Sequence, residues 1–208
     1  GHESRDYKIE STIVRHVKGK KKECSVEDIL EAEKNEYNLF RRDVFKTEWL
    51  HNKPQKTDEM LFAMSIGRHL GLPCRLIDVT ASLETAIWFA VMNPKFHNVD
   101  GEIILIYLCK NDVLETNQSP FNATKLSYAH EPFMTDSLSD LPLGEQRRFV
   151  QNGHFIWVDN NSLLNEEQVI KDSVVLVRHF TISWRAKNTL AKELRRDVYK
   201  GFIHRFNC

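Results

Sequence analysis

The sequence of 208 residues has few cysteines, and their spacing is not that of a metal site or a disulfide framework. None of the four forms a CxxC pair; they are Cys24, Cys74, Cys109 and Cys208. This spacing argues against a zinc site and against dense disulfides, and it favours a reducing, cytoplasmic compartment. No apolar run approaches the ~18 residues needed to span a bilayer, and no signal peptide is recognisable, so we expect no membrane contact.

Several catalytic signatures are also missing. No glycine-rich phosphate loop is present, which disfavours a P-loop or Rossmann site. No G-x-S-x-G elbow occurs, so a nucleophilic triad is not expected. No H-E-x-x-H motif appears, and His, Asp and Glu do not gather at metal-ligand spacing, so we predict no metal.

The sequence has no excess charge of either sign, since 29 Lys and Arg balance 29 Asp and Glu. No global field therefore steers the chain toward nucleic acid or an anionic membrane. The apolar share of 41% and the charged share of 28% are those of an ordinary globular protein. A chain of this length buries roughly 70% of its unfolded surface, so we expect a core that needs no disulfide.

Apolar residues at helical spacing predict four helices, which follow an irregular or extended entry over residues 1–16. The helices are expected over 26–50, from Thr57 to about 70, from Thr80 or Ser82 to 93, and after Ser183. Ser25, with Asp28 three residues later, is typical of a helix cap.

Short apolar runs predict strands over 74–79, 103–108, 153–158 and 173–182. The unbroken run over 103–108 suggests a central strand, and residues 111–145 are interpreted as long loops with at most short elements. Because helices come first and most strands later, the sequence predicts the α+β class. We expect a single domain in which N-terminal helices pack on a mixed or antiparallel sheet.

Residues 68–80 read Arg-His-Leu-Gly-Leu-Pro-Cys-Arg-Leu-Ile-Asp-Val-Thr, and Phe89-Ala90 follow in an apolar segment. This string resembles the FRG domain signature, approximately Q-H-x-G-x-P-T-R-L-x-D-W-T before a helix ending in F-A. It departs from the signature at Arg68, Cys74 and Val79. Residues 148–155 resemble the late R-x-x-Q-x-G-x-F element of the family.

Gly1-His2-Glu3 and Tyr7 resemble the sequence that follows the Phe and Arg of the Phe-Arg-Gly motif, and these two motif residues are not present before Gly1. We therefore expect an FRG-like domain over 1–208 with a truncated N-terminal motif. Its core is expected over 1–158, with a C-terminal strand and helix over 173–200.

The element order that this resemblance implies is similar to that of ADP-ribosyltransferases. Those enzymes hold NAD with an early Arg or His, a Ser/Thr-rich strand and a late acidic residue. The resemblance thus implies a nucleotide ligand, with NAD as the candidate cofactor, on fold-level analogy.

His69 and Asp78 are the candidate acid–base pair. A helix end favours protonated His69, and a contact with Asp78 would orient its ring. Asp78 and Thr80 share a strand face just before the helix that Ser82 caps, where free N–H groups would accept a phosphate. The alternatives remain that His69 is a core residue and that the polar side chains only cap the helix.

Three further candidates complete the expected site. The Gln151 amide would grip a ribose or base but cannot act as a general base. Glu145, the nearest upstream acid, would stabilise a ribosyl cation. Arg75 lies on the strand face opposite Asp78 and would meet a phosphate only if the strand bends. Cys74 is interpreted as a buried position rather than a nucleophile.

Two other functions stay open. The first is a non-catalytic module that binds a protein or peptide. The second is a nucleic-acid binder that uses the basic loop Lys18–Lys22 and a cationic stripe on the C-terminal helix. That stripe consists of Arg185, Lys192, Arg196 and Lys200. The simpler interpretation of both basic segments is a solvated charged face.

Overall fold

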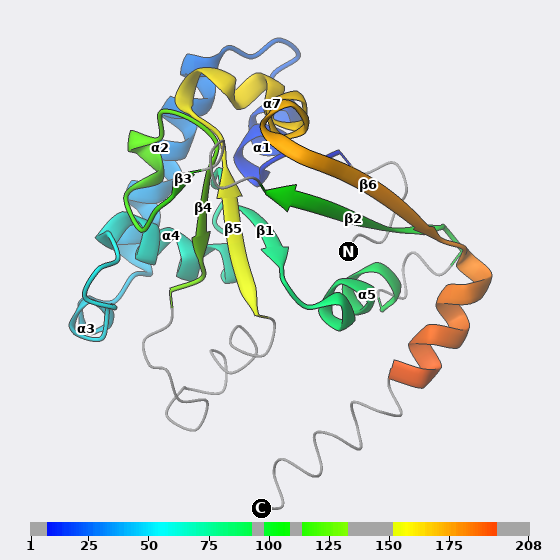
Figure 1. Cartoon of the computed structure of the whole chain (residues 1–208). Helices are drawn as coiled ribbons and strands as arrows, with labels where there is room; N and C mark the ends of the chain where they lie inside the picture. Colours follow the sequence, from blue (N-terminus) through cyan, green and yellow to red (C-terminus); the bar gives the residue numbers. More distant parts are fainter. Residues whose placement is uncertain (1–7, 93–97, 109–113, 133–151, 195–208) are drawn as a thin grey trace, which may run out of the picture. The chain divides into compact units, whose positions relative to one another are not determined.

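A computed structural model describes residues 8–92, 98–108, 114–132 and 152–194 (Figure 1). The chain divides into two compact units. The larger unit consists of residues 8–81 and 108–175, and the smaller one of residues 1–7, 82–107 and 176–208. Each unit is described by itself.

Helices occupy most of the first half of the larger unit. They are α1 (Thr12–Lys20), α2 (Val26–Asp43), α3 (Thr47–His51) and α4 (Glu59–His69), with η4 (Asn160–Asn165) and α7 (Glu166–Ser173) later in the chain. The predicted cap of α2 is confirmed. Ser25 Oγ accepts a hydrogen bond from the Asp28 N–H, and Asp28 accepts one from the Ser25 N–H. This capping box satisfies two donors that the first helical turn leaves unpaired.

The larger unit contains a sheet of four strands in the order β1-β5-β4-β3. They are β1 (Ile77–Thr80), β5 (Gly153–Trp157), β4 (Ser127–His130) and β3 (Leu114–Glu115), with the short helix η2 (Pro120–Asn122) between β3 and β4. β5 pairs antiparallel with both β1 and β4, and β3 pairs parallel with β4. The sheet is therefore mixed.

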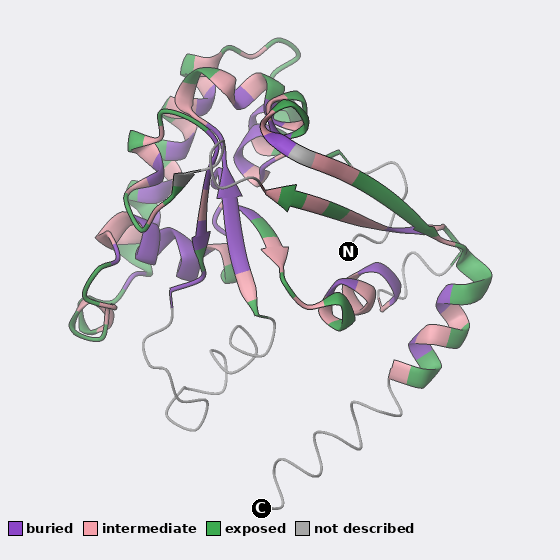
Figure 2. Cartoon of the chain, in the orientation of Figure 1, coloured by how far each residue is buried: buried purple, intermediate pink, exposed green. Residues whose placement is uncertain are grey.

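The main core lies between this sheet and α4. Phe155 and Trp157 on β5 and Ala129 on β4 pack against Leu61 and Phe62 of α4. Figure 2 shows β5 and α4 as the most continuously buried elements of the unit. Because side chains alternate along a strand, His154 and Ile156 of β5 face the other side of the sheet.

A fully buried ion pair crosses the larger unit. Arg75 and Glu33 both have 0% exposed side chains, and their closest nitrogen and oxygen atoms are 2.6 Å apart. Arg75 also donates to the carbonyl of Pro120 and to the side chain of Asn160. Its guanidinium lies over the ring of Phe121 at 5.0 Å. This one side chain thus joins α2, the approach to β1, η2 and η4.

The smaller unit contains α5 (Leu83–Val91), β2 (Gly101–Leu108) and most of β6 (Val174–Ile182). A final helix is described over residues 184–194. β2 and β6 form a two-stranded sheet. Ala90 and Val91 of α5 pack with Ala191 of the final helix.

The α+β class and the N-terminal helices agree with the prediction. Four details were wrong. Residues 12–16 belong to a helix, and the helix expected over 26–50 is interrupted between α2 and α3. The interruption occurs where Phe45 enters the core, 6% exposed, against the rings of Phe40, Trp49 and Phe62.

The cap of α4 is Asp58 rather than Thr57, since Asp58 accepts hydrogen bonds from the N–H groups of Met60 and Leu61. The strand expected to be central, β2, has only one partner strand among the described residues and exposes Leu105 and Tyr107. The unbroken apolar run thus predicted the strand correctly, but the burial expected of a central strand was wrong. Within the described ranges, no helix is long and apolar enough to cross a membrane.

Glu33→Gln tests the importance of the buried ion pair. The substitution leaves the Arg75 charge in a dry interior, and we expect a loss of about 3–5 kcal/mol in the free energy of unfolding. Urea denaturation measures it. Arg42→Ala is the control, because Arg42 pairs with Asp43 on the surface and should change the stability little. Equal effects of the two substitutions would contradict the assignment.

Glu166→Gln tests a second buried carboxylate. Glu166 is 2% exposed and accepts a hydrogen bond from the Ser11 N–H at 2.5 Å. Burial raises the pKa of Glu166 to about 7 from an ordinary value of 4.5. The folded state therefore holds this proton more tightly than the unfolded state, and stability falls as the pH rises from about 4.5 to about 7.

We expect Glu166→Gln to remove this part of the pH dependence, up to about 3 kcal/mol between the two ends of the window. Thermal or urea unfolding at several pH values measures it. Glu167→Gln, on the partly exposed face of α7, is the control and should keep the wild-type slope. An unchanged slope in Glu166→Gln would show that another group titrates.

Candidate functional site

The turn that follows α4 positions the candidate residues at the end of this helix next to β1. Gly71 has a φ of +92°, which only glycine adopts readily, and the chain reverses there. Leu72 then packs onto Gly67, where a Cβ atom would lie 2.6 Å from the Leu72 side chain. This tight return places Arg68 and His69 at the end of α4 beside the strand that begins at Ile77.

The His69 ring lies within hydrogen-bond distance of Glu131, a residue directly after β4. His69 Nε2 and Glu131 Oε1 are 2.6 Å apart. The Glu131 side chain is 2% exposed, whereas that of His69 is 28% exposed. A buried carboxylate therefore holds one nitrogen of a solvent-reachable imidazole.

Gly153 makes room for this pair. It begins β5, and its carbonyl accepts a hydrogen bond from the Glu131 N–H at 3.1 Å. A Cβ atom at Gly153 would collide with Glu131 Oε2. The absence of a side chain at position 153 is thus a condition for the His69–Glu131 contact.

Asp78 and Thr80 lie on the same face of the sheet, beside Gly153. The strand register pairs Thr80 with Gly153 and Asp78 with Phe155. Asp78, with 51% of its side chain exposed, forms an ion pair with Arg68. The Thr80 hydroxyl donates to the carbonyl of Asn152 at 3.3 Å. His69, Asp78 and Thr80 are therefore gathered at one end of β1, β4 and β5.

The partners differ from those expected. A contact between His69 and Asp78 was predicted, but His69 pairs with Glu131 and Asp78 pairs with Arg68. Sequence reasoning missed Glu131, because it lies in a segment without periodicity and 62 residues from His69. No local motif marks it.

The other candidates lie elsewhere. Arg75 is fully buried in the ion pair with Glu33, so it does not face this site. Ser82 belongs to the smaller unit, where its hydroxyl accepts the Thr85 N–H at 3.1 Å and caps α5. Gln151 and Glu145 lie outside the described residues. Cys74 is buried, and burial raises the pKa of its thiol far above the ordinary value.

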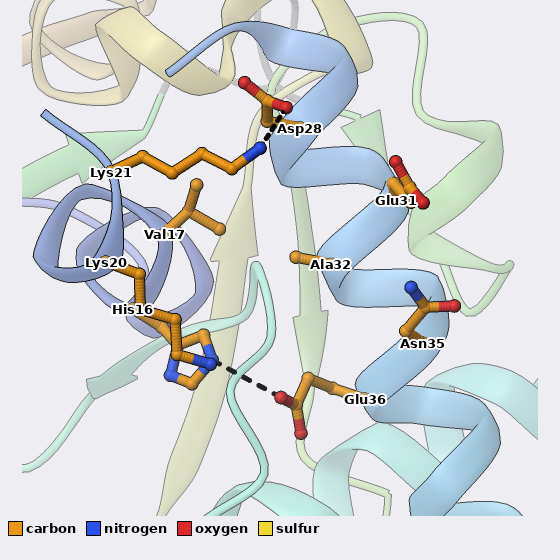
Figure 3. Close-up of a pocket in the computed structure, with 9 residues that line it drawn as sticks. All are labelled: His16, Val17, Lys20, Lys21, Asp28, Glu31, Ala32, Asn35 and Glu36. Carbon is orange, nitrogen blue, oxygen red and sulfur yellow. Dashed lines mark hydrogen bonds and ion pairs between the residues drawn. The ribbon is translucent and has the colours of Figure 1, made fainter. Parts of the chain in front are cut away.

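The basic segment Lys18–Lys22 begins inside α1, which extends to Lys20, and two of its lysines pair with acids. Lys18 pairs with Glu10, and Lys21 pairs with Asp28 at 2.5 Å. A hollow of about 310 Å³ lies beside this segment, between α1 and α2. Figure 3 shows His16 and Glu36 facing each other across it, so its lining carries both signs of charge.

The C-terminal stripe is described only in part. The Arg185 guanidinium lies 5.3 Å from the centre of the Trp184 ring, and Arg196 and Lys200 lie outside the described residues. In the parts that the structure describes, no three His, Cys, Asp or Glu side chains form a group able to hold a metal ion.

The arrangement around His69 is suited to proton transfer. A carboxylate that accepts from one ring nitrogen fixes the orientation of the imidazole. The neighbouring Asp78 carboxylate and Thr80 hydroxyl supply groups that bind hydroxyls of a ligand.

Comparison with known proteins gives one match. The family model described as the FRG domain matches residues 1–98. The match contains α4 and β1, and therefore His69, Asp78 and Thr80, but not Glu131 or Gly153. No curated protein and no solved structure matches the chain at a significant level.

Gly153→Ala tests whether the glycine is needed for the His69–Glu131 contact. The new methyl group forces the Glu131 carboxylate away from His69, and we expect a loss of about 1–3 kcal/mol in stability. Gly19→Ala is the control, because a Cβ atom there meets nothing within 4 Å. Combining Gly153→Ala with Glu131→Ala should cost less than the sum of the two single changes. Strict additivity would contradict the collision.

Proposed function

The chain carries an FRG domain over residues 1–98, and from this premise we propose that it binds a nucleotide, with NAD as the ligand, in a site of the ADP-ribosyltransferase type. The proposal rests mainly on the convergence of His69, Asp78 and Thr80 with the buried Glu131 at one end of a sheet. Glu131 comes from a distant part of the chain, and the His69 and Asp78 side chains are 28% and 51% exposed.

Each residue has a distinct role in the proposal. Asp78 and Thr80 accept hydrogen bonds from ribose hydroxyls, and Asp78 exchanges part of its contact with Arg68 for the ligand. His69 exchanges the proton, and Glu131 positions its ring without touching the substrate. Glu145 and Gln151 keep the roles expected from the sequence, stabilising the ribosyl cation and holding the base.

The reaction in this proposal is a ribosyl transfer. The bond between ribose C1′ and the nicotinamide nitrogen breaks, and its electron pair leaves with nicotinamide. In the same step an acceptor hydroxyl forms a bond to C1′ and gives up its proton to His69. An acceptor that is water gives ADP-ribose, and an acceptor on a macromolecule gives a modified product.

Protein binding is a second candidate function, and the smaller unit supplies its support. Leu105, Tyr107, Phe180 and Trp184 are 38%, 52%, 49% and 42% exposed. Leu105 and Tyr107 lie on the same face of β2, because side chains alternate along a strand, and exposed apolar side chains gathered on one face mark an interaction surface. The paired lysines of the basic segment give no comparable support to nucleic-acid binding.

NAD titration of the wild-type chain and two variants tests the leading proposal. His69→Asn keeps a similar volume without a titratable ring, so we expect retained NAD binding and nicotinamide release slowed by about 10²–10⁴-fold. Asp78→Asn removes the carboxylate charge, and we expect binding weakened by about tenfold. Calorimetry measures binding, and chromatography measures released nicotinamide.

Asp172→Asn on the outer face of α7 is the matched control and should behave as wild type. Absence of heat with NAD at about 1 mM, where even a weak site would respond, would overturn the nucleotide proposal. Binding without nicotinamide release in any condition would remove only the catalytic part.

A further inference from the structure

The face of the four-stranded sheet that turns away from α4 carries three ring side chains that the proposed site does not use. Tyr128 and His130 come from β4 and His154 from β5. In the antiparallel register His130 lies opposite His154, and Tyr128 lies opposite Ile156. Because Ala129 and Phe155 point into the core, their neighbours Tyr128, His130 and His154 project from the other face.

These three side chains form one cluster. The Tyr128 hydroxyl and His154 Nδ1 are 2.6 Å apart, and their rings stack at 17° with centroids 5.3 Å apart. The His130 ring lies 4.4 Å from that of His154 and 5.6 Å from that of Tyr128. The Tyr128 contact fixes the orientation of the His154 ring.

The three side chains of the cluster differ in how far they are buried. His154 is 5% exposed and Tyr128 is half-buried, whereas the side chain of His130 is 67% exposed. The contacts of His130 are the two neighbouring rings and a distant Glu115 at 3.9 Å. One imidazole of the cluster therefore presents its surface to solvent.

One polar atom of the cluster is unsatisfied. His154 Nε2 is buried and has no hydrogen-bond partner among the residues that the structure describes. Buried polar atoms without a hydrogen-bond partner are rare in folded proteins, and a missing ligand is one reason for such an atom. An imidazole nitrogen donates in one tautomer and accepts in the other, so a ligand with either group would satisfy it.

We propose that this cluster binds the planar heteroaromatic ring of a nucleotide, which stacks on the exposed His130 ring and displaces it enough to hydrogen-bond to His154 Nε2. The inference rests on the proposed function, since it names the part of the ligand that the residues around His69 do not hold. The cluster adjoins that site along the chain, because His130 precedes Glu131 and Gly153 precedes His154. The two groups of residues thus lie at the same end of β4 and β5, on opposite faces.

The chemistry of the cluster suits a ring better than a phosphate. Its surface consists of aromatic carbon and imidazole, and the Glu115 carboxylate lies 3.9 Å from His130 and repels anions. Stacking on an aromatic side chain tolerates different bases, because every base has a π face. Adenine and nicotinamide share this chemistry, so the experiment includes both.

The test titrates adenosine, nicotinamide and ribose 5-phosphate separately into the chain and follows the imidazole signals of His130 and His154 by NMR. We expect at least one of the two ring ligands to shift both sets of signals, including the nitrogen resonance of His154 Nε2. Ribose 5-phosphate has no ring and should not shift them. The ligand that responds tells which ring occupies the cluster.

His130→Ala should weaken binding of the responding ring ligand by about tenfold, the effect of losing one stacking contact. Because His130 is exposed, the variant is expected to fold, and His51→Ala on the exposed end of α3 is the control for removal of a surface imidazole. Equal ring affinity of wild type and His130→Ala would overturn the inference.

The outcomes separate this inference from the proposed function. If NAD binds equally well to wild type and to His130→Ala, the ring-site inference is wrong and the nucleotide proposal is retained. Adenosine or nicotinamide binding that depends on His130, together with no binding of NAD, supports the ring site and removes the NAD proposal. No response to any ligand removes both.

Discussion

The buried pair of Arg75 and Glu33 is the interaction on which the larger unit depends. Two unexposed charges are stable in a protein interior only when each is paired and hydrogen-bonded. Arg75 meets this condition because Glu33 accepts from its Nε, Nη2 and backbone N–H, while Pro120 and Asn160 accept from its Nη1. Four separate chain segments must therefore assemble around a single guanidinium.

This pair also determines where the candidate site lies. Arg75 is anchored two residues before β1 begins, so the strand starts from a fixed point and its side-chain alternation is set. Asp78 and Thr80 consequently share the face that meets the end of α4. The string that resembles the FRG signature thus combines residues of two kinds. Gly71 forms the turn after α4, and Arg75 anchors the start of β1. His69, Asp78 and Thr80 are the polar side chains that this turn and strand position.

Local signals in the sequence predicted local structure well. The capping box of α2, the glycine turn after α4 and the strand near Ile77 are each decided by residues within a few positions of one another. The interruption after α2 was not predictable in this way, because Phe45 leaves the helix to pack against the distant ring of Phe62. Tertiary packing outweighed helical periodicity there.

Only the candidate-site residues inside the family signature could be predicted from the sequence. The family signature pointed to His69, Asp78 and Thr80, and the structure places these residues together. Their partners come from β4 and β5, and no pattern in the sequence links Glu131 to His69 across 62 residues. The pairing of Glu33 with Arg75 was not predictable for the same reason, since the two residues are 42 positions apart. In the sequence, Glu33 looks like any other charged residue of an amphipathic helix.

The register between β4 and β5 explains why two groups of polar side chains occur at one end of the sheet. His130 pairs with His154, so their chain neighbours Glu131 and Gly153 meet on the opposite face. A slip of one residue would send every side chain of β4 to the other face and separate both groups. Gly153 restrains such a slip, because it is the residue beside Glu131 that leaves room for the carboxylate. The geometry of His69 and the stacking of His130 are therefore consequences of the same pairing, and a change that disturbs one is expected to disturb the other.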